Sequence, residues 1–214
     1  MNVGNFIMPK NETSRGGRFD EAIAVFKREG GMLRTGQALR KGIHPSTLYA
    51  LRDSGIVEPV SRGVYRLAEA PALGDPDLVV VATRVPQGVI CLISALAFHG
   101  ITTQIPHEVH LALPRGAEEP RLDHPPIATY RFTGEAFSEG VENHVLDNVN
   151  VRIYCPEKTL ADCFKFRNKI GMDTAIEAVR LYRERREVKV NDLMRYAAIC
   201  RVAKVMRPYI EAIL

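Results

Sequence analysis

The residues of this chain that could do chemistry fall into patterns that lack a required partner or spacing. His-Glu-Val-His over residues 107–110 is one residue short of the HExxH spacing that presents two histidines to zinc from a helix, and its alternation predicts a strand. Asp75 and Asp77 form a DxD pair like the metal-binding pair of nucleotidyltransferases, but Pro76 separates them and no glycine-serine turn precedes them. Both patterns therefore predict linker and strand residues rather than a metal site.

A second group of acids, Glu142, Asp147 and Glu157, lies close in sequence to Lys158, as in some nucleases. Nuclease sites need an acid one residue from the lysine and another acid on a neighbouring strand to share a metal, and the spacing here differs. No glycine-rich phosphate loop or catalytic triad can be assembled from the sequence. We therefore expect no catalytic residues, no metal and no cofactor, and predict that the protein is not an enzyme. A nuclease stays open as the alternative.

Residues 35–67 offer small polar, aromatic and arginine side chains of the kind that contact DNA. Thr35 is expected to cap a short helix, Gly42 to end it, and Pro45 to begin a second helix. Strands over 56–60 and 64–67, joined by a turn at 61–63, complete the pattern. Two helices followed by a hairpin predict a winged helix-turn-helix, although such modules also serve as protein contacts.

Within this stretch, the second helix is expected to reach base edges through Ser46, Thr47 and Tyr49. Arg62 and Arg66 on the ribbon are expected to contact the DNA backbone or minor groove. The full set of expected DNA-binding residues is Thr35, His44, Ser46, Thr47, Tyr49, Arg52, Arg62 and Arg66.

Charge is divided along the chain in three blocks. Residues 1–68 hold 11 lysines and arginines against 6 acids, residues 69–150 hold 4 against 11, and residues 151–214 hold 14 against 8. Two basic surfaces separated by an acidic one are predicted, and the basic surfaces should bind phosphates in a salt-dependent way.

The overall fold class expected is α+β. Residues 1–17 are predicted to be a flexible arm, 18–69 the winged helix-turn-helix domain, and 70–214 an α+β domain with a small mostly antiparallel sheet and C-terminal helices. In that second domain, helices are predicted over 76–84, 90–99, 156–166, 173–185 and 191–203, with a last one reaching residue 214. Strands are predicted over 108–113, 127–132, 141–146 and 149–154, the last two joined by a turn at 147–148.

The four cysteines show no CxxC pair and predict reduced, mostly buried thiols. No apolar run approaches the roughly 20 residues of a membrane helix, and the first residues lack the order of a signal peptide. A cytoplasmic location without membrane contact is therefore expected.

Two motifs make residues 18–214 resemble the AbiEi family, the antitoxins of type IV toxin–antitoxin (abortive infection) systems. The more specific motif is the stretch PEKTLADCFKFRNKIG of residues 156–171, and the other consists of Leu48, Gly55, Val60, Arg62, Gly63, Val64 and Tyr65. The resemblance implies a winged helix-turn-helix that binds inverted repeats in the protein's own promoter, and hence negative autoregulation. It also implies a functional partner, a nucleotidyltransferase toxin, that is opposed without a stable complex.

The helix of the more specific motif is expected to bury Leu160, Cys163 and Phe164. A basic face of this antitoxin domain is expected to consist of Lys158, Lys165, Arg167 and Lys169. Such a face could contact phosphates of DNA or RNA, or be merely solvated. A ligand-sensing repressor, with the second domain as sensor, also stays open.

Overall fold

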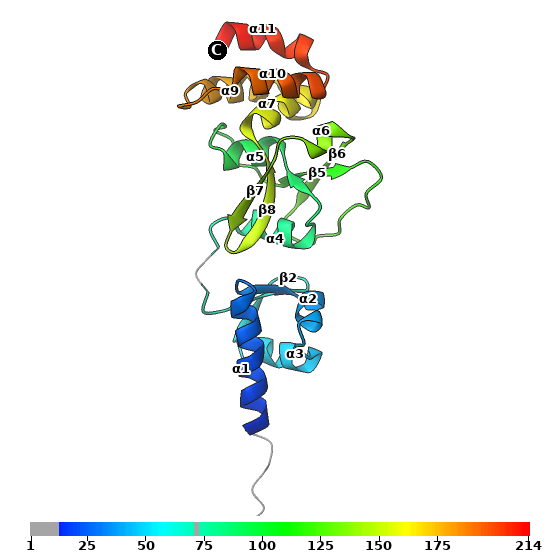
Figure 1. The fold of residues 1–214 in the computed structure, drawn as a ribbon, viewed down its shortest axis with the longest axis vertical. Coiled ribbons are helices and arrows are strands. Elements are labelled where there is room, and N and C mark those ends of the chain that lie inside the picture. The colour runs from blue at the N-terminus through cyan, green and yellow to red at the C-terminus, as the bar shows by residue number, and fades with distance from the viewer. Residues whose placement is uncertain (1–12, 71–72) are drawn as a thin grey trace, which may run out of the picture. The chain divides into compact units, whose positions relative to one another are not determined.

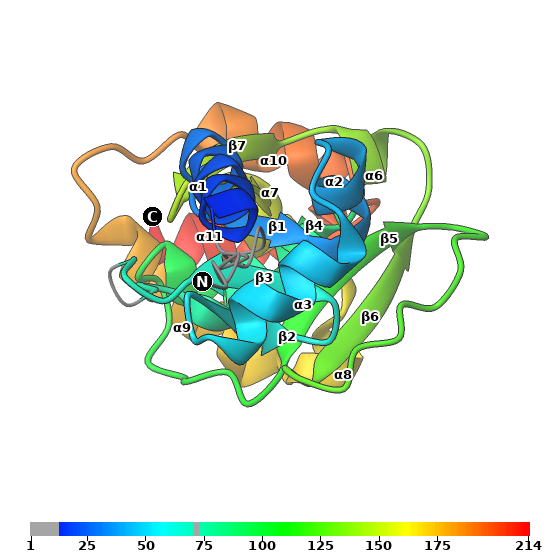
Figure 2. The same ribbon diagram turned by 90° about the horizontal axis from the view of Figure 1, so that it is seen from below.

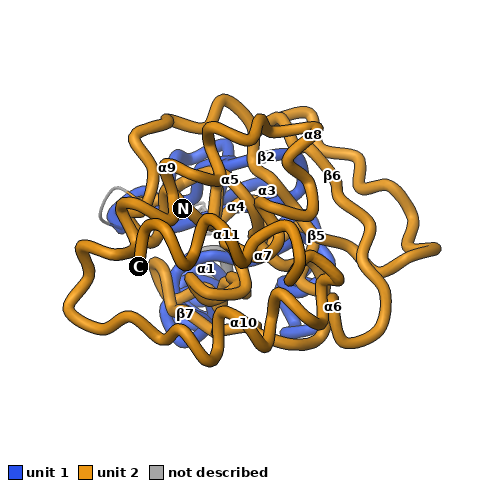
Figure 3. Tube along the Cα trace, turned by 90° about the horizontal axis from the view of Figure 1, so that it is seen from above, with its two compact units in different colours: residues 1–72 blue, residues 73–214 orange. Residues whose placement is uncertain are grey.

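The computed structural model describes residues 13–70 and 73–214, which divide into two compact units on either side of residue 72 (Figure 3). Each unit has its own apolar core and is described by itself. The predicted arm of residues 1–17 lies mostly outside the described residues, and the first helix begins at Thr13, within the predicted arm.

Unit 1 is a winged helix-turn-helix. Its elements are α1 (Thr13–Arg28), β1 (Met32–Arg34), α2 (Thr35–Arg40), α3 (Pro45–Asp53), β2 (Val57–Ser61) and β3 (Val64–Leu67). The three strands form an antiparallel sheet in the order β1-β3-β2. Helix α1 packs against α3 and β3 (Figure 2). Phe26, Leu48 and Leu51, all fully buried, join these elements into one core.

Unit 2 combines a five-stranded sheet with helices, which confirms the α+β class. Its strands are β4 (Val89–Ile90), β5 (Val109–Pro114), β6 (Ile127–Phe132), β7 (Val141–Leu146) and β8 (Val149–Tyr154). Its helices are α4 (Pro76–Arg84), α5 (Leu92–Phe98), α6 (Glu135–Ser138), α7 (Pro156–Lys165), α8 (Arg167–Ile170), α9 (Met172–Arg183), α10 (Val190–Ile199) and α11 (Ala203–Ile213).

The sheet of unit 2 has the order β6-β5-β4-β8-β7 and is more mixed than expected. Strands β5–β6 and β4–β8 pair parallel, whereas β4–β5 and β7–β8 pair antiparallel. The short strand β4 lies where the sequence predicted the start of a helix at residue 90, and the helix begins only at Leu92. This central strand joins the β5–β6 pair to the β7–β8 hairpin.

Both faces of this sheet are buried, because successive side chains of a strand point to opposite sides. On β5, Leu111 and Leu113 pack into one core with α4, while Ala112 between them packs into a second core. That second core holds the helices α5, α7, α9, α10 and α11, which Figure 1 shows gathered on one side. Helix α7 lies at its centre, and every residue from Pro156 to Phe164 is buried.

Candidate nucleic-acid interface

The turn between α2 and α3 is built by residues with distinct local roles. Gly42, with a φ of 92°, ends α2 in the left-handed conformation that glycine adopts without strain. Ile43 is buried beneath the turn. His44 caps α3, because its Nδ1 accepts a hydrogen bond from the Ser46 backbone N–H at 3.3 Å, and Pro45 occupies the first helical position. These contacts fix the start of α3, where His44, Pro45 and Ser46 are exposed.

Helix α2 is capped differently from the prediction. Its cap position is Arg34, whose backbone N–H donates to Gln37 Oε1 at 2.9 Å, and Thr35 is the first helical residue. The Thr35 backbone N–H donates to the Gly63 carbonyl at 2.9 Å. Thr35 therefore ties the start of α2 to the turn of the β2–β3 hairpin.

The faces of α3 are divided between core and solvent. Leu48 and Leu51 are buried, and so is Thr47, which is only 8% exposed. The expectation that the Thr47 side chain faces outward is therefore wrong: Thr47 lies one position before Leu48 and turns with it toward the core. The exposed row of α3 consists of His44, Ser46, Tyr49 and Arg52.

Two members of this row contact each other. The Arg52 guanidinium lies over the Tyr49 ring, 5.1 Å from its centroid. Arg52 also donates to Asp53 Oδ1 at 2.7 Å, and this hydrogen bond raises the pKa of the guanidinium above its ordinary value. The pair offers a flat aromatic and cationic surface of the kind that packs on sugars and phosphates.

The hairpin β2–β3 presents its two arginines unequally. Arg62 lies exposed in the turn beside Gly63, whose φ is 72°. Arg66 faces Glu58 across the hairpin, where its Nε donates to the Glu58 carboxylate, and its Nη2 donates to the Ala70 carbonyl at 3.2 Å. Only 13% of the Arg66 side chain is exposed. Arg62 is thus at the tip of the wing, whereas Arg66 is held along its strand.

One of the four residues predicted for the basic face of α7, Lys158, does not lie at the surface. Lys158 is fully buried, and its Nζ donates to both carboxylate oxygens of Asp162 at 2.7 and 2.6 Å. The same Nζ lies 4.1 Å from the centroid of the Tyr154 ring. Burial raises the pKa of Asp162, and the charge of Lys158 opposes that shift. This ion pair belongs to the core because the sheet covers one side of α7 and other helices cover the rest.

The other three basic residues of this region stay at or near the surface. Lys169 is exposed, with its Nζ 5.3 Å from the Tyr130 ring centroid, and Lys165 is half-buried over Phe132. Arg167 Nη1 donates to the Phe164 carbonyl at 2.8 Å. Lys165, Arg167 and Lys169 form what we call the α7–α8 basic patch.

The acids and histidines considered for catalysis are engaged elsewhere. Glu157 accepts a hydrogen bond from the Tyr182 hydroxyl at 2.7 Å, and Asp147 accepts one from the Gly74 backbone N–H at 3.1 Å. Asp147 lies at the turn of the β7–β8 hairpin, roughly 16 Å along the strand from Glu142. Glu142 and Glu157 both line a hollow of about 680 Å³, but Asp147 does not line it and Lys158 is buried. The structure therefore does not assemble the four nuclease candidates into one site.

In the HEVH sequence, His110 is buried and its Nδ1 accepts the Ile93 backbone N–H at 3.3 Å, while His107 is exposed. Across residues 13–70 and 73–214, no three His, Cys, Asp or Glu side chains gather so that they could hold a metal ion.

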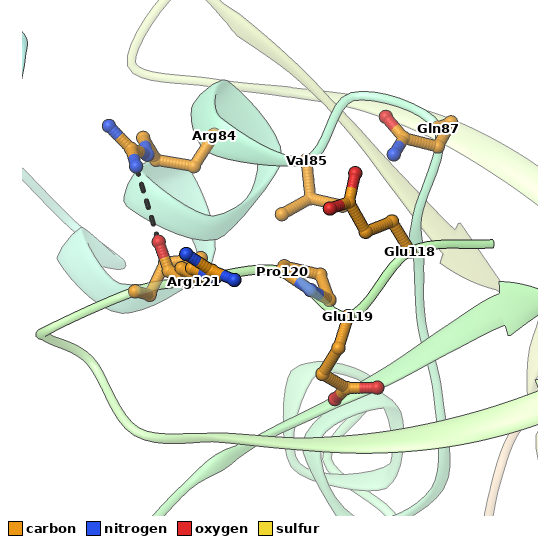
Figure 4. A pocket seen from close by; sticks show the side chains of 8 residues that line it. Arg84, Val85, Gln87, Glu118, Glu119, Pro120 and Arg121 are labelled. Carbon is orange, nitrogen blue, oxygen red and sulfur yellow. Dashed lines mark hydrogen bonds between the residues drawn. The ribbon is translucent and has the colours of Figure 1, made fainter.

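Unit 2 also has surface hollows, which bear on the ligand-sensing alternative. One of about 380 Å³ lies between the end of α4 and residues 118–122 (Figure 4). There Arg84 donates to the Arg121 carbonyl at 3.2 Å, and Glu118 points toward Val85 and Gln87. Its charged groups of both signs are spread along an exposed loop and do not converge on a single point.

No helix in the described part of the chain is long and apolar enough to cross a membrane.

Comparison with known proteins agrees with the geometry of unit 1. Residues 20–68 match the family model described as the transcriptional regulator, AbiEi antitoxin. The expected resemblance is confirmed over these residues, and the stretch 156–171 lies outside the match. No curated protein matches the chain.

Among solved structures, the crystal structure of the RV2827C protein from Mycobacterium tuberculosis is similar with a TM-score of 0.59 and 14% identity. The match covers 91% of this chain and 73% of that protein, and it shows a shared fold. Residues 20–68, with their exposed α3 row and their wing, thus match the AbiEi antitoxin family of transcriptional regulators over the winged helix-turn-helix.

Proposed function

We propose that this protein represses its own operon in the cytoplasm by binding inverted repeats in its promoter, and that it opposes a nucleotidyltransferase toxin without forming a stable complex with it. The observation that carries the DNA-binding part is the exposed α3 row flanked by the wing. Inverted repeats would be bound by two copies of the chain, one on each half-site.

The α3 row supports base recognition by position and chemistry. Ser46 and Tyr49 are exposed near the start of α3, the part of a recognition helix that reaches base edges. The His44 ring accepts from the Ser46 backbone and lies 2.8 Å from its hydroxyl, so the two polar groups hold each other in place. We propose that Ser46 and Tyr49 contact bases and that Thr35 and Thr47 contribute by positioning the helix.

The basic side chains are proposed to contact phosphates. Arg62 at the wing tip and Arg52 beside Tyr49 can reach the backbone on either side of the groove, whereas Arg66 supports the wing through Glu58. Each phosphate contact releases counterions, so affinity should fall steeply with salt.

The experiment is fluorescence anisotropy of the full chain on its own upstream DNA and on a scrambled duplex, over a series of salt concentrations. Arg62→Ala should weaken binding to both duplexes and flatten the salt slope by about one unit. Arg115→Ala, which removes an exposed arginine from unit 2, is the matched control and should leave both unchanged. Ser46→Ala should reduce the preference for the upstream DNA by roughly 1 kcal/mol or more. Equal binding of the two duplexes by the unaltered protein would refute the proposal.

The antitoxin part is proposed to reside in unit 2, with the α7–α8 basic patch contacting phosphates of the RNA that a toxin modifies. Where the proposed nucleotidyltransferase toxin inhibits growth, co-expression of this chain should restore it. Replacing Lys165, Arg167 and Lys169 together by alanine should weaken that rescue while leaving promoter binding intact. Full rescue by this triple variant would remove the patch from the proposal.

A further inference from the structure

An apolar groove of about 400 Å³ crosses unit 2 between α5 and the start of α4. Its walls come from Ala97 and Phe98 of α5 and from Ile105 and Pro106 in the loop that leads to β5. None of these residues belongs to the α3 row, the wing or the α7–α8 basic patch.

The groove leaves large apolar groups in contact with water. The Ile105 side chain is 82% exposed, and Phe98 is half-buried. The loop before Ile105 is anchored to α9, because the Thr103 backbone N–H donates to Glu177 Oε1 at 3.2 Å and Gln104 Nε2 donates to Thr174 Oγ1 at 2.9 Å. An exposed isoleucine on an anchored loop beside a hollow is a feature of protein interaction sites, since solvation of such groups is unfavourable.

The charged groups on the rim are three carboxylates, those of Asp75, Asp77 and Glu108. Asp75 and Asp77 lie at the start of α4, where the Asp75 side chain makes no capping hydrogen bond. The side chains of Asp77 and Glu108 are 58% and 47% exposed. These three groups give the groove a negative rim.

The basic groups near these carboxylates are weak partners. His124 Nε2 lies 3.9 Å from Asp77, and His110 Nε2 lies 3.7 Å from Glu108. Burial lowers the pKa of His110 below its ordinary value, so its ring is neutral at pH 7. Within residues 13–70 and 73–214, no lysine or arginine forms an ion pair with any of the three carboxylates.

We propose that this groove binds a segment of a partner protein in which one large apolar side chain is flanked by lysines or arginines. The apolar side chain would be buried between Phe98 and Ile105, and the flanking cations would meet the carboxylates of the rim. The same negative rim repels nucleic acid and acidic peptides. This proposal goes beyond promoter binding and does not depend on it.

The test uses the full chain and a fluorescently labelled peptide with a central leucine between lysines, followed by anisotropy at low salt. Ile105→Ser should weaken binding about tenfold, because it removes most of one apolar contact. Asp77→Asn/Glu108→Gln should weaken it several-fold and flatten its salt dependence.

Matched controls are Val145→Ser, at a side chain 73% exposed on β7, and Glu118→Gln/Glu135→Gln, at exposed acids away from the rim. Both controls should bind the peptide as the unaltered chain does. Promoter binding by Ile105→Ser should be unchanged, which separates this proposal from the proposed function.

Three outcomes would overturn the proposal. Groove variants and controls could bind the peptide equally well. A peptide with serine in place of leucine could bind as tightly, which would reduce the interaction to non-specific charge attraction. Sedimentation could instead show that the unaltered chain self-associates and that Ile105→Ser does not, which would assign the groove to a second copy of the chain.

Discussion

Removing one partner of the buried Lys158–Asp162 pair should destabilise unit 2 far more than removing both. The two charges lie 2.6–2.7 Å apart, and both side chains are fully buried. At an effective dielectric constant near 20, their attraction is about 6 kcal/mol, while desolvation costs several kcal/mol for each ion. The pair as a whole is therefore close to neutral for stability, but one charge left alone has its desolvation cost unopposed.

We expect Lys158→Met and Asp162→Asn each to lower the free energy of unfolding by about 3–5 kcal/mol. The double variant Lys158→Met/Asp162→Leu should lie within roughly 2 kcal/mol of the unaltered protein. Urea unfolding followed by tyrosine fluorescence and circular dichroism measures this, because five of the seven tyrosines lie in unit 2. Lys165→Met is the matched control, since its ammonium also lies over Phe132 but is half-buried and forms no ion pair with a carboxylate of the described residues. It should cost less than about 1 kcal/mol. Losses that simply add in the double variant, or a loss below 1 kcal/mol for Lys158→Met, would refute the reasoning.

Further expectations concern the turn before β7, the histidines of unit 2 and the inner side of α3. Gly140→Ala should lower the free energy of unfolding in urea by about 2–4 kcal/mol, because residue 140 has a φ of 73° and an added Cβ would lie 2.6 Å from Lys158 Cβ. Gly116 also has a positive φ but faces open space, so Gly116→Ala should show only the part of this loss that comes from backbone strain. Burial lowers the pKa of His99 and of His110, so the unfolded chain binds protons more readily, and stability should fall as the pH drops below about 6.5. His110→Asn keeps an acceptor for the Ile93 backbone N–H and should make that loss of stability smaller. Unfolding measured between pH 7 and pH 5 tests this. Thr47→Val should leave the preference for promoter DNA within twofold of the unaltered protein because Thr47 is buried, and a change as large as that of Ser46→Ala would place its hydroxyl in the interface.

Local patterns in the sequence were enough to predict α2, α3 and the β2–β3 hairpin of unit 1 and the β7–β8 hairpin of unit 2, whereas β1 was not predicted. Gly42 and Pro45 mark the end of α2 and the start of α3 because their backbone preferences act within one or two residues. Asp147 and Asn148 both have positive φ, as a two-residue hairpin turn requires, and the predicted strands flank them. Such signals do not depend on the rest of the fold.

The sequence predictions were wrong where contacts between distant parts of the chain determine the local structure. Strand β4 contains only Val89 and Ile90, too few residues for a periodic signal, and it exists because β5 and β8 pair with it on both sides. Lys158 has the sequence signature of an exposed helix residue, but its partner Asp162 and the rings of Phe132 and Tyr154 make an interior site for it. Thr47 faces inward because α1 and the sheet cover that side of α3. The spacing of residues in a helix predicts the direction in which each side chain points, but it does not predict how many faces of the helix are covered by other elements.

The burial of α7 from Pro156 to Phe164 changes what the stretch PEKTLADCF can indicate about relatives of this protein. All residues from Pro156 to Phe164 are buried, so this segment offers a toxin, an RNA or a promoter very little surface while the fold is intact. Chains that share these letters would share an interior and could still differ in everything they bind. Searches for proteins with the same target would do better to compare the outward residues of α3, the wing tip and the acid-rimmed groove.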